Sequence, residues 1–211
     1  MRNNKTYKLT LAAVFSSITA LLTFTPIGMI PLPPPLLAVT LVHLPVLIAT
    51  ITGGITVGMI TGLTFGVCSC IRAWEIGAIS LTFFFRNPLI SVLPRLIIPL
   101  ASWLVFFLWS KNIKNTPTMK KIGISISAVV GSIVNTCASL GMLLLIYEVD
   151  LNNYINQLVS KGNESIEYLD NAAFWLISVV GIPNGIAEMV VALIIVPVVC
   201  TAIQFQKRKK K

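Results

Sequence analysis

The chain has 211 residues, of which 55% are hydrophobic and 11% are charged, and its mean hydropathy is +0.87. Soluble domains average about 25% charged residues, so this composition excludes a protein whose whole surface faces water. Several apolar runs reach the roughly 20 residues that a helix needs to cross the hydrocarbon core of a bilayer. The weak alternation in segments of about 10 residues that marks a transmembrane β-barrel is absent from the sequence. The composition predicts an all-α, polytopic membrane protein.

The net charge of +9 would suggest nucleic acid as the partner of a soluble protein, but here the positive residues cluster at the ends of apolar segments. That placement is typical of topology determinants, because cytoplasmic loops carry an excess of Lys and Arg. We therefore expect a lipid bilayer, and no nucleic acid, as the partner. The four cysteines lie within apolar segments and lack the spacing of a zinc site or of a redox CxxC. Neither a metal nor a cofactor is predicted.

Six apolar stretches are predicted to span the bilayer as one integral domain, residues 1–211. We expect the helices at about residues 8–25, 36–51, 55–70, 88–109, 122–147 and 172–205. The two chain ends and the loop 111–121 are basic, whereas residues 148–171 contain five acids and one lysine. Both termini are therefore predicted to be cytoplasmic, and residues 148–171 are predicted to form a polar external loop.

Residues 26–66 begin with a proline-rich segment and continue with two apolar segments that a glycine pair separates. Clustered prolines exclude helix and favour an extended, stiff chain. Because this segment is also apolar, we expect it to lie as a lid over other helices. The glycines Gly54, Gly58, Gly62 and Gly66 repeat every four residues, which predicts a flat helix face for close packing.

A stripe of small residues marks the first predicted helix. Ala12, Ser16 and Ala20 repeat every four residues, and Ala13 and Ser17 widen the stripe. Such a stripe lets a second helix approach closely. Two interpretations remain open at this point, a contact with a partner protein and packing inside this chain.

Two charges are predicted within the apolar spans. Arg95 lies seven residues into the helix predicted from Pro88, which places it roughly 10 Å below the helix start. A charge at such depth costs about 2.5 kcal/mol or more and usually faces a cavity or a partner. Glu188 is similarly placed, a few residues after a break at Pro183-Asn184. The two charges form either a structural ion pair or part of a binding site.

Uncharged polar residues extend this candidate site. Asn184 follows a proline, and helix breaks at membrane depth are tolerated where the backbone lines a water-filled cavity. Asn135 and Thr136 add hydrogen-bonding groups in the fifth span. His43, the single histidine, is interpreted either as a solute or loop contact or as a packing residue. The remaining candidates, which supply polar contacts or apolar walls, are Arg86, Asn87, Trp74, Trp103 and residues 83–85.

Motifs for catalysis are missing from the sequence. It contains no HExxH, no nucleophile elbow, no acidic cluster for a metal and no Walker lysine. We therefore predict no catalytic residue and no enzyme activity. Because the chain also has no ATP site of its own, active transport would require partner subunits.

Several segments together resemble the substrate-binding S component of energy-coupling factor (ECF) vitamin transporters, over nearly all of the chain. The segments that carry the resemblance are AAVFSSITA, IPLPPPLLAVTLVHLPVLIATITGG, GMITGLTFG, NPLISVLPR, GSIVNT and GIPNGIAEMVVALIIVP. The resemblance implies a multi-pass protein of the bacterial cell membrane that binds a vitamin or precursor near its outer face. It also implies a transmembrane T component and two cytoplasmic ATPases as partners.

The resemblance further implies that the first helix contacts the T component through an AxxxA motif. Here Ala12, Ser16 and Ala20 occupy that face, with serine at the second small position. The VHLPV and NPLISVLPR segments look most like the pantothenate-type branch, and a carboxylate substrate would suit Arg95. Riboflavin, folate and pyridoxine remain open as substrates.

Two other classes compete with this interpretation. A scaffolding membrane protein of the cell-shape type would need neither a buried arginine nor a lid. An autonomous secondary transporter usually shows internal repeats with paired broken helices, whereas this sequence shows one break, near Pro183, and no repeat.

Overall fold

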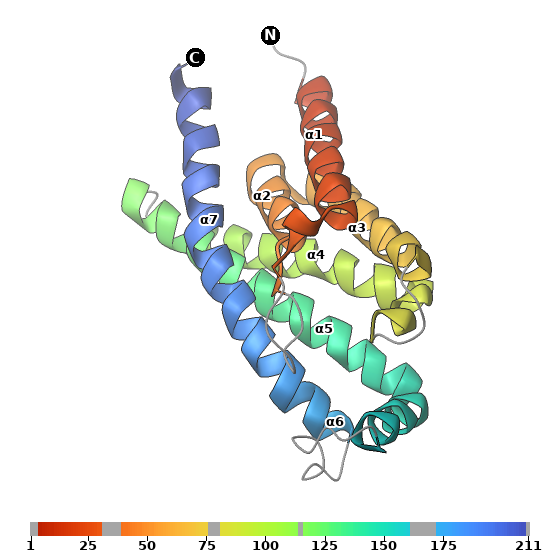
Figure 1. Ribbon diagram of the computed structural model, residues 1–211. Coiled ribbons are helices and arrows are strands. Elements are labelled where there is room, and N and C mark those ends of the chain that lie inside the picture. Colours follow the sequence, from red (N-terminus) through yellow and green to blue (C-terminus); the bar gives the residue numbers. More distant parts are fainter. Residues whose placement is uncertain (1–3, 31–38, 76–80, 114–115, 161–171, 210–211) are drawn as a thin grey trace.

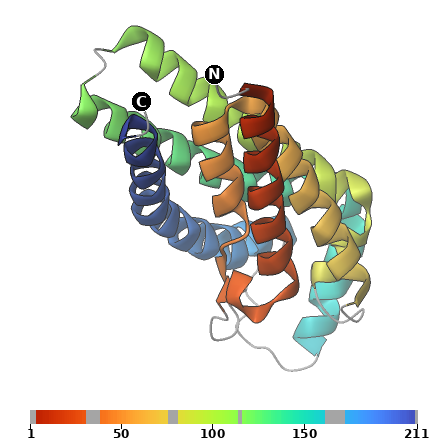
Figure 2. The same cartoon turned by 90° about the horizontal axis from the view of Figure 1, so that it is seen from above.

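The computed structural model describes residues 4–30, 39–75, 81–113, 116–160 and 172–209, which form a helical bundle with both chain ends at the same end (Figures 1 and 2). The helices are α1 (Asn4–Phe24), α2 (His43–Gly53), α3 (Ile55–Glu75), α4 (Pro88–Asn112), α5 (Pro117–Ser160), α6 (Ala172–Trp175) and α7 (Ile182–Lys209). The shorter elements are the 3-10 turns η1 (Pro26–Gly28) and η2 (Leu81–Arg86), the π-helical turn η4 (Leu176–Gly181), and the two-residue strands β1 (Met29–Ile30) and β2 (Val39–Thr40).

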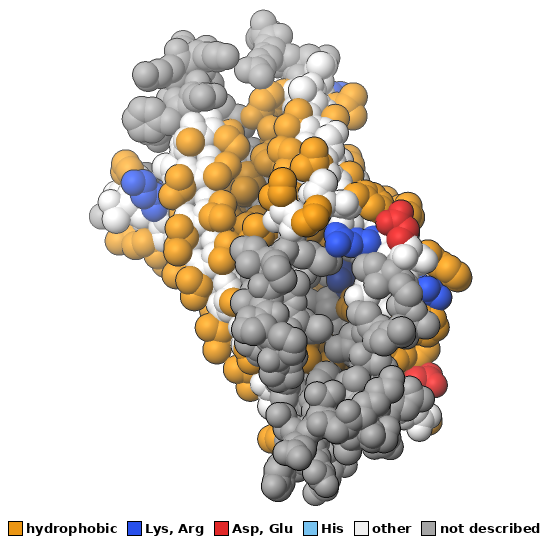
Figure 3. All heavy atoms as spheres, in the orientation of Figure 1, with side chains coloured by type: hydrophobic (Ala, Val, Ile, Leu, Met, Phe, Trp, Pro, Cys, Tyr) orange, Lys and Arg blue, Asp and Glu red, His pale blue; other side chains and the backbone are white. Residues whose placement is uncertain are grey.

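Within the described residues, five helices are long and apolar enough to cross a membrane, namely α1, α3, α4, α5 and the helix formed by η4 with α7. Hydrophobic side chains cover most of the described surface in Figure 3. A shorter apolar helix, α2, has 11 residues, and every residue from His43 to Ile51 is buried. This short helix is therefore the centre of the core, surrounded by the longer ones. The prediction of an all-α polytopic membrane protein is confirmed.

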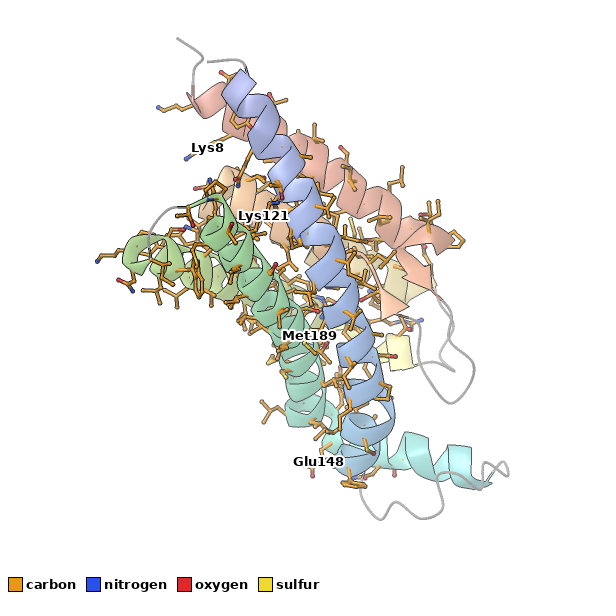
Figure 4. All side chains as sticks on the ribbon, turned by 90° about the vertical axis from the view of Figure 1, so that its left-hand side faces the viewer. Lys8, Lys121, Glu148 and Met189 are labelled. Carbon is orange, nitrogen blue, oxygen red and sulfur yellow. The ribbon has the colours of Figure 1, made fainter. Side chains whose placement is uncertain are left out.

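Charges mark the two ends of the bundle. In Figure 4, Lys8 and Lys121 lie toward the end that holds both termini, and Glu148 lies toward the opposite end, with Met189 between them. This distribution agrees with the positive-inside rule, which assigns the end with the termini to the cytoplasm.

The start of α2 and the end of α5 differ most from the prediction. α2 begins at His43 rather than at residue 36, because Val39–Thr40 pairs as β2 with β1. In the proline-rich segment expected as an extended lid, Pro26–Gly28 forms the 3-10 turn η1 and Met29–Ile30 forms β1, and residues 31–38 lie outside the described residues. α5 continues to Ser160, with a kink at Tyr147. Residues 148–160, which were predicted as part of a loop, are therefore helical. Polar side chains indicate exposure to water and do not by themselves exclude a helix. Residues 161–171 of the expected loop lie outside the described residues.

The predicted glycine face is confirmed for three of its four members. A Cβ at Gly62 would lie 2.6 Å from the carbonyl oxygen of Arg95, and one at Gly66 would lie 2.7 Å from the Cα of Val92, while Gly58 lies against Thr50 and Pro99. These glycines let α3 approach the backbone of α4. Gly54 is different, because it lies between α2 and α3 with a φ of 89°, a left-handed conformation that glycine adopts without strain.

Replacing Gly62 with Ala is expected to destabilise the bundle, because the new methyl would collide with a backbone oxygen that cannot move alone. Overpacking of this kind typically costs about 1–3 kcal/mol. The matched control is Gly141→Ala in α5, where a Cβ would meet nothing within 4 Å and alanine has the higher helix propensity. Melting temperatures in detergent should fall for Gly62→Ala and should not fall for Gly141→Ala. Equal melting temperatures for the two variants would refute the close contact between α3 and α4.

The expected break near Pro183 takes the form of a widened helix. Pro183 has no N–H to donate, so the α-helical hydrogen-bond pattern cannot pass through it unchanged. The residues before it form the π-helical turn η4, which runs directly into α7. The interruption is therefore a local change of pitch, and α7 does not begin with the free amino end of a separate half-helix.

Part of the predicted small-residue stripe on α1 is covered by other helices. Ala12 is only 2% exposed, and Ser16 accepts a hydrogen bond of 3.1 Å from Thr64 of α3. Ala20 is half-buried. Part of the stripe therefore packs inside this chain, and the assignment of Ala12, Ser16 and Ala20 as a docking face stays a prediction. The spacing identified a close helix contact and could not distinguish its own chain from a partner.

Candidate functional site

A cavity of about 340 Å³ lies between α3, α4, α5 and α7. Its lining includes the carboxyl ends of α1 and α3 and the start of α7, together with η2 and β2. The polar lining residues are Thr23, Thr40, Ser69, Arg72, Thr82, Arg95, Asn135, Thr136, Ser139, Asn184 and Glu188, and the apolar ones are Val42, Phe65, Phe85, Leu140 and Val180.

Arg95 occupies one wall of the cavity, and the local sequence explains how its charge is held. Pro94 lacks the N–H that would otherwise bond to the carbonyl of Ile90. The guanidinium of Arg95 binds that carbonyl instead, because its Nη1 donates a hydrogen bond to the oxygen of Ile90 at 3.1 Å. The proline therefore creates a buried acceptor, and the next residue in the chain satisfies it.

The rest of the Arg95 environment comes from three other elements. Nη1 also donates to Ser139 Oγ of α5 at 2.9 Å. The guanidinium carbon lies 5.2 Å from the ring centre of Phe65 and 5.0 Å from that of Phe85, within the range of cation–π attraction. Arg95 Nε is buried and has no partner among the described residues. The arginine is positioned by neutral groups and keeps hydrogen-bonding capacity.

Glu188 lies on α7 and binds groups from two other elements. Its Oε1 accepts hydrogen bonds from Thr40 N at 3.1 Å and from Thr40 Oγ1 at 2.5 Å. Its Oε2 accepts from Asn135 Nδ2 at 3.2 Å and from Thr136 Oγ1 at 3.4 Å. The carboxylate thus joins β2, α5 and α7 at the edge of the cavity.

The two buried charges share the cavity without pairing. Both line it, yet the hydrogen bonds of Arg95 go to Ile90 and Ser139, and those of Glu188 come from Thr40 and α5. The structure of the described residues contains no ion pair between them. The structural ion pair is therefore the weaker of the two interpretations of these charges.

Two side-chain amides complete the polar lining. Asn135 and Asn184 are buried, and the Oδ1 of each lacks a hydrogen-bond partner among the described residues. Buried acceptors of this kind are rare in folded proteins, and each one calls for an explanation. Here both belong to residues that line the cavity.

The structure brings together four of the nine predicted binding residues, namely Arg95, Asn135, Asn184 and Glu188. His43 is fully buried at the start of α2 and is not part of the lining, and neither of its ring nitrogens has a hydrogen-bond partner among the described residues. Its complete burial fits the interpretation as a packing residue, and a contact with the solute or the loop stays a prediction.

Among the other predicted candidates, Phe85 lines the cavity, whereas Arg86, Asn87, Trp74 and Trp103 do not. Arg86 donates from Nε to the carbonyl of Ala73 at 2.9 Å, and its guanidinium stacks over Trp74, which is 65% exposed. Asn87 caps α4 by accepting from Leu89 N at 3.0 Å. Trp103 stacks on Phe107 with ring centres 5.1 Å apart. These contacts give the four residues packing and capping roles.

The sequence reasoning missed several lining residues. The strand pair places Thr40 in the lining, and the end of α1 places Thr23 there. Arg72 lines the cavity from α3, and its Nη1 donates to the carbonyl of Thr23. Ser139 follows Asn135 by one helical turn, and that spacing was the one available signal for it. For Arg72, its position near the outer end of a span was visible, but the direction of its side chain was not.

Comparison with known proteins identifies the family. A family model described as "ECF transporter, substrate-specific component" matches residues 7–200, which include every residue that lines the cavity. No match was found among curated proteins. Substrate-specific components of this family are multi-pass proteins of the cell membrane, as the apolar helices here require. The chain belongs to the family of substrate-specific components of ECF transporters.

Proposed function

We propose that this protein binds a water-soluble vitamin or vitamin precursor at the outer face of the membrane for ATP-driven uptake, with pantothenate as the favoured substrate. The observation that carries the proposal is Arg95, a buried cation held by neutral groups in a cavity. Intramembrane charges are costly and usually mark a substrate pathway or a partner. A scaffolding protein would have no use for this arrangement.

The shape and lining of the cavity support a small organic solute. Its volume of about 340 Å³ is at the lower end of the range of roughly 300–1,000 Å³ that small-molecule sites occupy. Aromatic and aliphatic walls alternate with a few convergent polar groups, the usual composition of such sites. A compact acid with some apolar surface fits this combination better than a large flat ring system does.

The energy for uptake must come from other subunits. The chain has no Walker lysine, and its family consists of the substrate-specific subunits of larger transporters. We therefore propose that it assembles with a transmembrane T component and two cytoplasmic ATPases. Ala13 and Ser17, which widen the stripe beside the buried Ala12, are exposed on α1. This exposed pair is the better candidate for the docking face.

Replacing Ala13 with Leu is expected to weaken assembly with the T component without changing solute binding, because the added side chain would hold two helices apart. The matched control is Cys137→Leu, which enlarges an exposed small residue of α5. Copurification of the T component with the tagged variants measures the effect. Full recovery of the T component with Ala13→Leu would place the docking face elsewhere.

The proposed function is tested most broadly with the tagged, unmodified protein. It should copurify with a T component and two ATPases from its own membranes, and the purified protein should bind a tritiated vitamin. Recovery of neither subunit type, together with uptake that does not depend on ATP, would contradict the assignment.

A further inference from the structure

We infer that the solute taken by this cavity is a monoanion whose other polar groups are uncharged hydrogen-bond donors. In the same arrangement, Glu188 is a positioning residue and not the counter-ion of a substrate amine. The inference rests on the proposed function, since it specifies the chemical class of the solute that this site accepts.

The hydrogen bonds that Glu188 already accepts argue against a cationic solute. An ionised carboxylate offers about four acceptor positions on its two oxygens. In this structure four protein donors occupy them, two from Thr40 and one each from Asn135 and Thr136. A substrate ammonium group would have to displace some of these bonds, which hold β2 against α5 and α7. The carboxylate is already satisfied by the protein.

The charges of the two lining arginines, and an unused donor on one of them, argue for an anionic solute. Arg72 and Arg95 line the cavity with Glu188, so two positive charges and one negative charge leave the lining at +1. A guanidinium has five N–H donors, and the Nε of Arg95 has no partner in the described part of the chain. One carboxylate would neutralise the lining, and Arg is the side chain best suited to bind such a group through two parallel hydrogen bonds.

The two asparagines determine what the rest of the solute offers. The Oδ1 atoms of Asn135 and Asn184 accept hydrogen bonds and cannot donate them, and both lack partners among the described residues. Hydroxyl or amide N–H groups on the solute would satisfy them without adding charge. An uncharged donor suffices here, because the one acidic side chain in the lining is already occupied.

A panel of labelled vitamins and a vitamin precursor, tested on the unmodified, purified protein, tests the inference. The panel contains pantothenate, nicotinate and biotin as monoanions, thiamine as a cation, β-alanine as a zwitterion, pyridoxine and riboflavin as uncharged compounds, and folate as a dianion. The tightest ligand is expected to be a monoanion. Its alcohol analogue, which lacks the carboxylate, is expected to bind at least about 100-fold more weakly.

The outcomes separate this inference from the proposed function. If a cation, a zwitterion, a dianion or an uncharged compound binds most tightly, the inference is wrong while solute binding stands. If no compound of any charge class binds, the proposed function fails and the inference fails with it. Because the panel uses the unmodified chain, it does not depend on whether a variant folds.

Two variants then test the separate roles of the charges by the ratio of affinities for the acid and its alcohol analogue. Glu188→Gln should keep this ratio or raise it, because the change removes the one negative charge of the lining and leaves both arginines in place. Arg72→Gln should lower the ratio about tenfold or more, a loss typical of removing a charged hydrogen-bonding partner. A lower ratio in Glu188→Gln, or an unchanged one in Arg72→Gln, would overturn the assignment of roles.

Discussion

Replacing Arg95 with Met is expected to abolish binding of an acidic vitamin while the protein still folds. Removing one partner of a buried, hydrogen-bonded charge pair costs about 2–5 kcal/mol, which corresponds to a loss of affinity of about 30-fold to several thousandfold. Methionine keeps much of the apolar stem and packs well against aromatic rings, here those of Phe65 and Phe85. Titration of the purified variant with the tritiated acid measures the loss.

Two further variants make this result specific. Arg95→Lys keeps the charge but loses the planar fork, so its affinity should lie between those of the unmodified protein and of Arg95→Met. Arg86→Met removes an arginine whose observed contacts lie outside the cavity lining, and it should bind the acid like the unmodified protein. If Arg95→Met bound the acid with unchanged affinity, Arg95 would have only a structural role.

Replacing Glu188 with Ala is expected to destabilise the protein strongly, and by more than Gly62→Ala does. The change leaves four donors without their acceptor, two of them from Thr40 and the others from Asn135 and Thr136. A buried donor without a partner costs about 1–3 kcal/mol, so the total is about 3 kcal/mol or more even after partial relaxation. The free energy of unfolding in detergent should fall by this amount, and β2 should lose its anchor to α7.

Glu188→Gln is the matched comparison for that loss. Glutamine keeps one acceptor oxygen for Thr40, and its N–H groups can meet the free oxygen of Asn135, so this variant should be clearly more stable than Glu188→Ala. Equal stability of the two variants would show that the hydrogen bonds at Glu188 contribute little. Equal stability of Glu188→Ala and the unmodified chain would refute the anchoring role altogether.

The core of the site was predictable because charge at membrane depth is so costly. Arg95 and Glu188 stand out within the apolar spans, and Asn135 and Asn184 follow from the same argument for uncharged polar groups. The burial of all four in one cavity agrees with that reasoning. The glycine repeat likewise predicted a close helix contact, which α3 makes with α4, because a missing Cβ has a steric consequence in any packed helix pair.

Other features depend on which way a helix faces, and composition does not determine that. Trp74 and Trp103 were predicted as cavity walls, but lipid and a solute pocket both favour aromatic side chains. The small residues of α1 predicted a close helix contact and left its partner open, and Ala12 is buried within this chain. Thr40 joins the site through a strand pair of two residues on each side, too short to leave a periodic signal.

The start of α2 shows a similar limit. Residues 36–42 continue the apolar run of the helix with little polar interruption, so the sequence predicted one longer element. In the structure the chain passes through β2, and Leu41 N bonds to the carbonyl of Gly28 at 2.9 Å before the helix begins. That contact is between segments that are separated by the proline-rich stretch, and hydrophobic periodicity carries no information about it.

The most direct test of the binding site is an experimental structure of the protein with its tightest-binding vitamin. Ligand density should fill the cavity between α3, α4, α5 and α7, with an acidic group within hydrogen-bonding distance of the Arg95 guanidinium and Glu188 still bound to Thr40. Density for the vitamin elsewhere, for example in the apolar groove that Val14 and Val199 line between α1 and α7, would contradict this assignment.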